Sequence, residues 1–271
     1  MLREMFLCNP VVDGSTVLYR HAKGKNPVPS KALLEVPGTL MSSVITATED
    51  VHTVGVIGTS DGDLLKVHIG NSTSARLYEI VPLDGSQVLT DIKINETSEE
   101  AYILTEKMLF KMRVENCSQY TTCETCIGTA AGNDGDPYCG WCTLERKCSR
   151  YAKCPLRGIS TRWLAYNAAQ CIVITRVTPY SNLPIDVTEQ QITLSMQQLP
   201  DLPTGQSYDC YFGSYASRAT KTDDTLSCTS PPKNSIPLIE QGDAVTVELS
   251  VYSTETSVEF IDTDFHFYNC S

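Results

Sequence analysis

Cysteine is the residue type with the widest chemistry in this chain, because a thiol can bind metal, exchange electrons or form a disulfide. The chain has 271 residues and 12 cysteines. Eight of them crowd into one stretch, with the spacing Cys117-x5-Cys123-x2-Cys126-x12-Cys139-x2-Cys142-x5-Cys148-x5-Cys154-x16-Cys171. Three kinds of chemistry use residues of this type: a zinc site, a thiol redox centre and a set of structural disulfides.

Two Cys-x2-Cys pairs separated by twelve residues are close to zinc-ribbon spacing, and four thiolates suit tetrahedral zinc. A ribbon, however, would leave the four other cysteines of the stretch without a role. A redox pair usually lies at the start of a helix in a βαβ setting, and no such pattern surrounds Cys123 or Cys139. Neither zinc binding nor thiol redox chemistry is therefore the favoured interpretation.

Structural disulfides account for all eight cysteines. A module of about 55 residues buries too little apolar surface to be stable alone, and disulfides replace the missing core. Each bridge typically contributes about 2–4 kcal/mol by restricting the unfolded chain. Eight cysteines allow 105 pairings, so the spacing leaves the connectivity open. Two glycosylation acceptors, Asn71 in Asn71-Ser72-Thr73 and Asn95 in Asn95-Glu96-Thr97, point with the cysteines to an extracellular location.

Other residue types form no convincing site. Turn-forming acids and amides beside glycine lack the spacing of a calcium loop: Asp61, Asp63, Asn133, Asp134 and Asp136. The four histidines are scattered, without metal-ligand spacing: His21, His52, His68 and His266. No nucleophile motif, phosphate loop or paired-carboxylate pattern occurs. We therefore expect no catalytic residues, no metal, no cofactor and no small-molecule substrate.

The net charge of the chain is -11 and its sequence pI is about 4.8. An acidic surface without Lys/Arg clusters argues against nucleic acid and anionic membrane as partners. Apolar runs are only strand-sized, so no membrane-spanning segment is predicted. Residues 1–20 lack the apolar core of a signal peptide. An extracellular composition without a leader leads us to expect a fragment whose true N-terminus lies upstream.

The elements before the cysteine-rich stretch are predicted to be hairpins. Asp61-Gly62 separates the apolar runs Thr53–Gly58 and Leu64–Ile69, which is a strong hairpin signal because glycine tolerates positive φ. Further strands are expected at 75–80, 88–94, 101–104 and 108–114. Apolar and polar residues alternate in the last of these, the pattern of a half-buried strand. Such short strands suit a sandwich or propeller blades, and the pattern alone does not separate the two.

The region after the cysteine-rich stretch is predicted to be a β-sandwich. We expect about seven strands, at 172–177, 185–187, 191–196, 207–212, 226–229, 244–252 and 258–268. Seven strands in roughly 100 residues is the size of an immunoglobulin domain. No amphipathic helix is evident anywhere, so the fold class is mainly β.

The cysteine-rich stretch closely resembles the module shared by plexins, semaphorins and integrins. The resemblance is carried by Cys117-Ser-Gln-Tyr-Thr-Thr-Cys123-Glu-Thr-Cys126, Asp136-Pro137-Tyr138-Cys139-Gly140-Trp141-Cys142, Lys147-Cys148-Ser149-Arg150 and Cys154. Semaphorins usually lack the cysteine after the tryptophan, so Cys142 favours plexins. The family pairing implied is Cys117–Cys139, Cys123–Cys171, Cys126–Cys148 and Cys142–Cys154. The family context also implies that Trp141 and Trp163 pack against the disulfides.

The flanking regions resemble plexins as well. Gly58-Thr-Ser-Asp-Gly-Asp63 and Ala101-Tyr-Ile-Leu-Thr-Glu-Lys107 resemble the end of a Sema propeller. Ile174-Thr-Arg-Val-Thr-Pro179 and Leu226-Ser-Cys-Thr-Ser-Pro-Pro232 resemble an IPT/TIG sandwich, although its usual Gly-Gly-Thr is replaced by Ile185-Asp-Val-Thr188. The resemblance implies a Cys210–Cys228 bridge in that sandwich. Cys270 would begin a second cysteine module, and the partners of Cys8 and Cys270 stay undetermined.

The resemblance implies domains at 1–116 (the last blades of a truncated propeller), 117–171 (the cysteine module), 172–269 (the sandwich) and 270–271 (the start of a second module). It implies the extracellular part of a cell-surface semaphorin receptor, with semaphorin bound mainly by blades outside this chain. A co-receptor or a homodimer is a further expected partner. Signalling would follow through a membrane span and a GTPase-regulating region, neither encoded here. A semaphorin-type ligand and a hepatocyte-growth-factor-receptor-like ectodomain are the alternatives.

Overall fold

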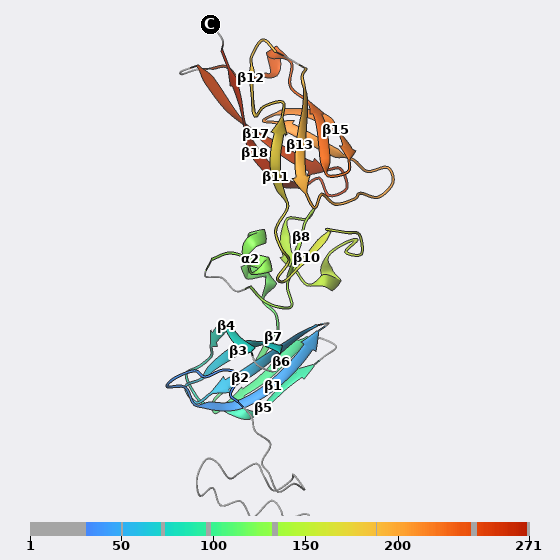
Figure 1. The fold of residues 1–271 in the computed structure, drawn as a ribbon. Helices are drawn as coiled ribbons and strands as arrows, with labels where there is room; N and C mark the ends of the chain where they lie inside the picture. Colours follow the sequence, from blue (N-terminus) through green and yellow to red (C-terminus); the bar gives the residue numbers. More distant parts are fainter. Residues whose placement is uncertain are drawn as a thin grey trace, which may run out of the picture.

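The computed structural model describes residues 31–49, 51–71, 74–95, 99–131, 135–187, 189–239 and 243–269. These residues form three units stacked along one axis, with two β units at the ends and the cysteine-rich module between them (Figure 1). The predicted mainly-β fold class is confirmed. Cys8, Cys270 and the predicted start of a second module at 270–271 lie outside the described residues.

The first β unit begins with a four-stranded antiparallel sheet in the order β1-β2-β3-β4. Its strands are β1 (Met41–Glu49), β2 (His52–Thr59), β3 (Asp63–Asn71) and β4 (Ser74–Pro82). The hairpin predicted at Asp61-Gly62 joins β2 to β3, and Gly62 has a φ of +86°. A side chain there would come within 2.7 Å of the backbone at Gly85 and Ser86, so the turn requires glycine. Strand β1 was not predicted.

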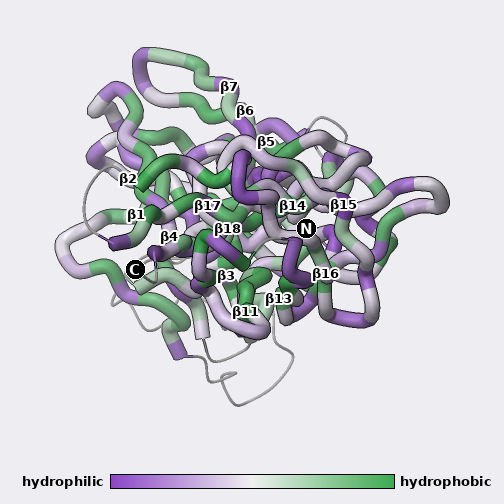
Figure 2. The backbone as a smooth tube through the Cα atoms, turned by 90° about the horizontal axis from the view of Figure 1, so that it is seen from above, coloured by the Kyte–Doolittle hydropathy of each residue, from purple (hydrophilic) through white to green (hydrophobic). Residues whose placement is uncertain are grey.

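A second sheet packs face to face against the first. It contains β5 (Val88–Asn95), β6 (Glu100–Thr105) and β7 (Leu109–Arg113), in that order. Residues from both sheets form one core, including Val56, Leu64, Val88 and Ile103. On β7 the predicted alternation is confirmed, with exposed residues at 109, 111 and 113 and half-buried residues at 110 and 112. Figure 2 shows hydrophobic and hydrophilic residues interspersed along the backbone.

The middle unit contains little regular structure. It has two short 3-10 helices, η1 (Cys117–Gln119) and η2 (Tyr151–Lys153), and a three-stranded sheet of β8 (Gly140–Cys142), β9 (Lys147–Ser149) and β10 (Trp163–Ala165). It also contains the single-turn helix α2 (Cys123–Ile127), although no helix was predicted. Thr122 caps this helix by accepting a hydrogen bond from the backbone of Thr125, and Gly128 ends it in the left-handed conformation.

The last unit is a single curled sheet in the order β11-β13-β16-β15-β14-β17-β18-β12. The long strand β15 pairs with β14 through its first half and with β16 through its second half, so the sheet folds into two layers. Aromatic rings of one layer point into the core, where Phe212 of β14 and Phe265 of β18 lie edge to face with their centres 5.3 Å apart. The strand bounds are Val173–Thr178 (β11), Asn182–Pro184 (β12), Gln191–Gln197 (β13), Tyr208–Phe212 (β14), Tyr215–Thr222 (β15), Thr225–Thr229 (β16), Ala244–Ser253 (β17) and Glu259–Tyr268 (β18).

Two details of this unit differ from the sequence prediction. The segment 185–187 is not a strand; instead Asn182–Pro184 pairs in parallel with the end of β18. The backbone N–H of Ile185 still donates to the carbonyl oxygen of Tyr268 at 2.9 Å, after which β18 ends and the chain turns, so no strand forms at 185–187. Strand β15 was missed, because its residues are mostly polar and small. Within the described residues no helix is long and apolar enough to cross a membrane.

Candidate functional site at the disulfide module

Four disulfides hold the middle unit together. Its core is built from cysteines together with Tyr120, Ile127, Trp141 and Leu164. Gly140 lies so close to Trp163 that a side chain there would meet the indole ring at 2.4 Å. The bridges join Cys117 to Cys139, Cys123 to Cys171, Cys126 to Cys148 and Cys142 to Cys154. These are the pairs that the family resemblance implies.

The four bridges link the helices α2, η1 and η2 of the module to β8, β9 and the segments around them. One connects α2 to β9, one connects η1 to the loop before β8, and one connects β8 to the end of η2. The Cys123–Cys171 bridge closes the longest loop and fixes the segment that leads into β11. In the sandwich, Cys210 on β14 is bonded to Cys228 on β16. All ten of these cysteines are at least nine-tenths buried, so the bridges act as core residues.

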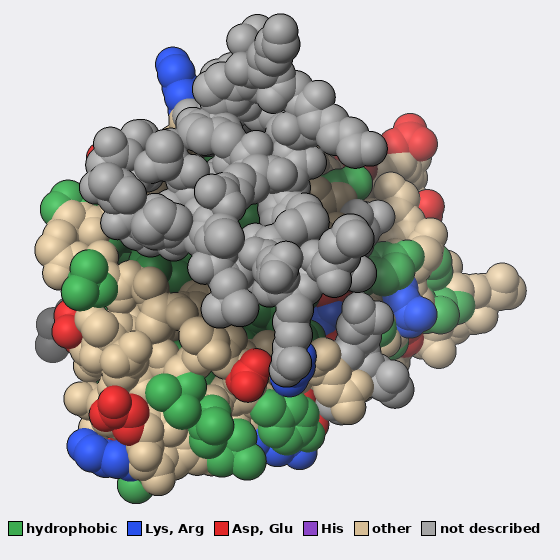
Figure 3. All heavy atoms as spheres, turned by 90° about the horizontal axis from the view of Figure 1, so that it is seen from below, with side chains coloured by type: hydrophobic (Ala, Val, Ile, Leu, Met, Phe, Trp, Pro, Cys, Tyr) green, Lys and Arg blue, Asp and Glu red, His purple; other side chains and the backbone are tan. Residues whose placement is uncertain are grey.

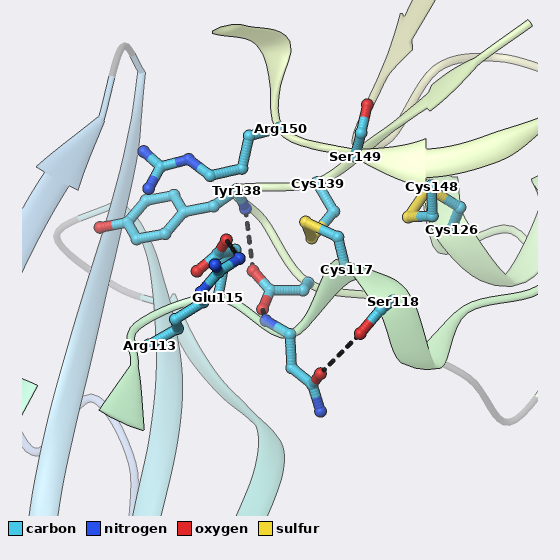
Figure 4. Close-up of a disulfide and its surroundings, with 12 residues drawn as sticks. Arg113, Glu115, Cys117, Ser118, Cys126, Tyr138, Cys139, Cys148, Ser149 and Arg150 are labelled. Atoms are coloured by element: carbon cyan, nitrogen blue, oxygen red, sulfur yellow. Dashed lines mark hydrogen bonds and ion pairs between the residues drawn. A yellow bond between two sulfur atoms is a disulfide. The ribbon is translucent and has the colours of Figure 1, made fainter. Parts of the chain in front are cut away.

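The junction with the first β unit is organised around a buried carboxylate. Asp136 is fully buried and accepts hydrogen bonds from the backbone N–H groups of Asn116, at 3.1 Å, and Tyr138, at 3.0 Å (Figure 4). Burial raises the pKa of Asp136 to about 6, and the two hydrogen bonds and the Lys66 charge oppose this rise. The Tyr138 hydroxyl extends across the junction and donates to the carbonyl oxygen of Ala47 on β1 at 2.6 Å.

Arg150 holds the same junction from the other side. Its guanidinium is only 6% exposed and forms ion pairs with Glu49 at the end of β1 and with Glu99 just before β6. It also lies 5.6 Å from the centre of the Tyr138 ring, in cation–π range. One side chain of the disulfide module therefore contacts both sheets of the first β unit.

A second contact at this junction is aromatic. The Nδ1 atom of His52 lies 3.3 Å from Nε2 of His68, and Tyr166 of the disulfide module packs edge-on against both imidazoles. Arg76 donates a hydrogen bond to the hydroxyl of Tyr166. Burial, with smaller contributions from the charges of His52 and Arg76, lowers the pKa of His68. His52 and His68 are 16 residues apart in the sequence, on the paired strands β2 and β3, and their spacing alone does not indicate this contact.

The junction with the sandwich has a similar design. Arg162 is completely buried and donates two hydrogen bonds to the carboxylate of Glu255, at 2.7 and 2.9 Å. A third contact joins Arg162 to Glu145 of its own module, at 3.5 Å. Beside this pair, Thr256 donates to the carbonyl oxygen of Leu144, and the Leu144 side chain packs within the sandwich core. The two units thus share apolar core as well as a buried ion pair.

The predicted glycosylation residues lie on the first β unit. Asn95 is exposed at the end of β5, and Asn71 ends β3. The remaining residues of both acceptor sequences lie outside the described residues. Glycosylation of Asn71 and Asn95 stays a prediction.

The contacts described above hold the three units together. Within the described residues, one group has metal-ligand separations: Cys142, Glu145 and Cys154. Both of its sulfurs are bonded to each other, so they offer no thiolate to a metal. Asp136, which the sequence suggested as a turn residue, does begin a turn, because the backbone N–H of Cys139 donates to its carbonyl oxygen at 2.9 Å. Its side chain is in addition the buried acceptor at the junction with the first β unit, the lower junction in Figure 1.

The chain is thus a mainly β protein in which a disulfide module joins two β units. A plexin repeat model matches residues 116–172, and a plexin TIG domain model matches residues 181–268. Mouse Plexin-A3 is 36% identical over 235 residues, which are 85% of this chain and 12% of that protein. Human Plexin-B1 is 32% identical over 247 residues, 90% of this chain and 11% of that protein.

A solved structure gives the same result. The full extracellular region of Plexin A4 superposes with a TM-score of 0.74 at 31% identity, covering 86% of this chain and 23% of that chain. The chain belongs to the plexin family. It spans about 12% of the length of the Plexin-A3 relatives, and it matches the ectodomain of Plexin A4.

Proposed function

We propose that this chain is the extracellular portion of a plexin-like cell-surface receptor for semaphorin, and that its described part serves as a stalk behind a ligand-binding propeller. Family membership supports the receptor role, and the structure supports the stalk role. The disulfides and buried groups fit an extracellular location at the plasma membrane. The receptor relatives also support a binding role over an enzymatic one for this chain.

One observation carries the stalk role: each junction of the disulfide module is held by a buried arginine. Arg150 is 6% exposed and Arg162 is 0% exposed, and each forms ion pairs with carboxylates of the adjoining unit. A buried charge that loses its partner costs several kcal/mol, so bending at either junction is strongly opposed. Flexible linkers between domains lack such contacts.

The proposed domains are 1–116 for propeller blades, 117–171 for the disulfide module and 172–269 for the sandwich. The first unit fits consecutive blades, because one four-stranded sheet packs against a second, three-stranded sheet. Semaphorin is proposed to bind mainly to other blades of the intact receptor. The relatives described above are plexins, so neither a semaphorin-type ligand nor a growth-factor receptor is proposed instead.

A chimeric receptor tests this function. The matching segment of mouse Plexin-A3 would be replaced by residues of this chain, and semaphorin-dependent collapse of cultured cells would be measured. We expect the chimera to respond, and the same chimera with Arg150→Ala and Arg162→Ala to respond weakly at equal surface density. A chimera that reaches the surface and binds semaphorin but never responds would contradict the stalk role. Unmodified Plexin-A3 is the positive control.

A further inference from the structure

A positively charged groove lies beside the lower junction and shares Arg150 with it. It has a volume of about 240 Å³. One wall comes from the chain between β7 and η1, and the other comes from β9 and η2. The groove is lined by Arg113, Glu115, Asn116, Cys117, Ser118, Lys147, Cys148, Ser149, Arg150 and Lys153. We call it the basic groove.

The charge of the basic groove is opposite to that of the whole chain. Four of its lining residues are cationic and one is acidic, whereas the chain carries a net charge of -11. Arg150 is already paired with Glu49 and Glu99. Three cations, Arg113, Lys147 and Lys153, then face the single carboxylate of Glu115, which leaves a local excess of positive charge. Clustered like charges in a concave surface attract an oppositely charged ligand.

The three cations are accessible. The side chain of Arg113 is 68% exposed and that of Lys153 is 50% exposed, and Lys147 is also exposed. Both Arg113 and Lys153 approach the same oxygen of Glu115, at 3.7 and 3.3 Å. Such exposed ion pairs contribute little to the stability of the fold, and their cations can exchange one partner for another. These three cations are therefore available to contact a ligand.

The walls of the groove also have unmet hydrogen-bonding capacity. Within the described residues, Oγ of Ser149, Nε of Arg150 and Oε2 of Glu115 are buried without a hydrogen-bond partner. Buried polar atoms are usually paired, and here three unpaired ones lie around one groove. Two of them can donate and one can only accept. All three atoms lie beneath the surface of the walls, so the exposed cations are the groups that a ligand contacts directly.

The positive surface continues along β7. Lys111 and Arg113 alternate with inward-facing residues and so lie on the same exposed side of that strand. Lys111 is 56% exposed, with one ion pair to Glu100. A linear polymer with repeated negative groups would contact both this strand and the groove.

We propose that the basic groove binds a sulfated polysaccharide, with Arg113, Lys147 and Lys153 contacting its sulfate groups. The choice of an extracellular polyanion rests on the proposed receptor location. Outside the groove the surface is acidic and repels a flat anionic membrane, whereas a single polysaccharide chain can follow the groove.

The test is binding of a heparin-derived decasaccharide to the full chain, measured by surface plasmon resonance at several salt concentrations. The test variant is Arg113→Gln/Lys147→Gln/Lys153→Gln. A matched control removes three cations from the sandwich, where each is paired with an aspartate: Arg218→Gln/Lys221→Gln/Lys233→Gln. Both variants change the net charge equally.

We expect the groove variant to lower the affinity for the decasaccharide about tenfold or more. The slope of log affinity against log salt concentration should become shallower by about one for each lost contact. The control variant should bind within about twofold of the native chain. Equal losses in both variants, or no binding at low salt, would overturn the proposal. Equal affinity for desulfated oligosaccharide, saturation of the groove by inorganic sulfate alone, or preferred binding to anionic vesicles would overturn it as well. None of these results depends on semaphorin, so the receptor proposal is tested separately.

Discussion

Arg162 of the disulfide module and Glu255 of the sandwich form a two-point ion pair at 2.7 and 2.9 Å, with the guanidinium completely buried between the two units. The planar guanidinium matches the carboxylate at both oxygens, which fixes orientation as well as distance. The segment that carries Glu255 is the tight turn between β17 and β18. The sandwich is thereby held at a turn, where its position would otherwise be least restrained.

Removing this arginine should be severely destabilising. Arg162→Ala would leave Glu255 and Glu145 close together without a cation, and breaking a buried pair costs about 3–5 kcal/mol. Chemical denaturation of the native and variant chains measures the difference. Arg146→Ala is the control, because that side chain is 45% exposed and pairs with Glu259 and Asp262 near the same junction. Its cost should stay within about 1 kcal/mol, and equal costs would contradict the assigned role of Arg162.

The contribution of Asp136 to the stability of the folded chain should increase as the pH falls toward 4. Its pKa is raised to about 6 in the folded chain, from 3.8 in the unfolded chain. The folded state therefore holds the proton more tightly, and stability increases as the pH falls from about 6 to 4. Thermal unfolding of the native chain and Asp136→Asn, measured across this range, should show a smaller pH dependence in the variant. An unchanged pH dependence would mean that Asp136 is not the titrating group.

His68 should give the folded chain the opposite pH dependence of stability. Because burial lowers its folded pKa below 6.5, the unfolded chain binds the proton more readily, and stability is lost as the pH falls through about 6.5. The groups around it are His52, Arg76 and Tyr166, with the Lys66–Glu79 pair on neighbouring positions of the same two strands. His68→Gln should remove this loss while retaining a polar side chain. Titration of the imidazole by nuclear magnetic resonance gives the direct check, and a pKa at or above 6.5 would disprove it.

The four bridges of the module should differ in their contributions to stability. The Cys123–Cys171 bridge spans 48 residues, whereas Cys142–Cys154 spans 12. Loop-closure entropy then favours the longer bridge by about 1 kcal/mol. Paired Cys→Ser variants, compared by denaturation under oxidising conditions, measure this difference. A larger loss from the Cys142–Cys154 pair would show that packing around Glu145 outweighs chain entropy.

Residues 117–269 should fold alone, whereas residues 1–116 should not be stable as a monomer. The first β unit exposes large apolar residues on its outer faces, including Val44, at 67%, and Leu109, at 67%. Exposed apolar surface forfeits roughly 25 cal/mol per Å², a large loss against a typical domain stability of about 5–15 kcal/mol. Limited proteolysis of 1–116, 117–269 and the whole chain tests this, and equal resistance of all three would contradict it.

The sequence was informative wherever local chemistry determines structure. The turn at Gly62 was predictable because only glycine accepts its backbone conformation without strain, and β17 was predictable from its alternating valines. Strands β1 and β15 were missed because serine and threonine carry much of their length, and their place in the sheets is set by neighbouring strands. Local pattern does not contain that information.

The junctions could not be predicted for a related reason. Arg150 and Arg162 are charged residues of ordinary type, and a charge normally indicates an exposed position. Their partners lie about 100 residues away in sequence, so no local signal pairs Arg162 with Glu255 or Arg150 with Glu49. The available hint was the position of both arginines inside a module too small to have its own apolar core.

The most direct test of the central claim, that the disulfide module holds the two β units as a rigid stalk, is a distance distribution by pulsed electron spin resonance. Labels on non-canonical residues at Asp91 and Asp223, both exposed, would leave every cysteine intact. The account predicts one narrow distribution for the native chain, and a broad one when Arg150 and Arg162 are both replaced by alanine. A broad distribution of distances in the native chain, which flexible linkers between the units would give, would contradict the claim.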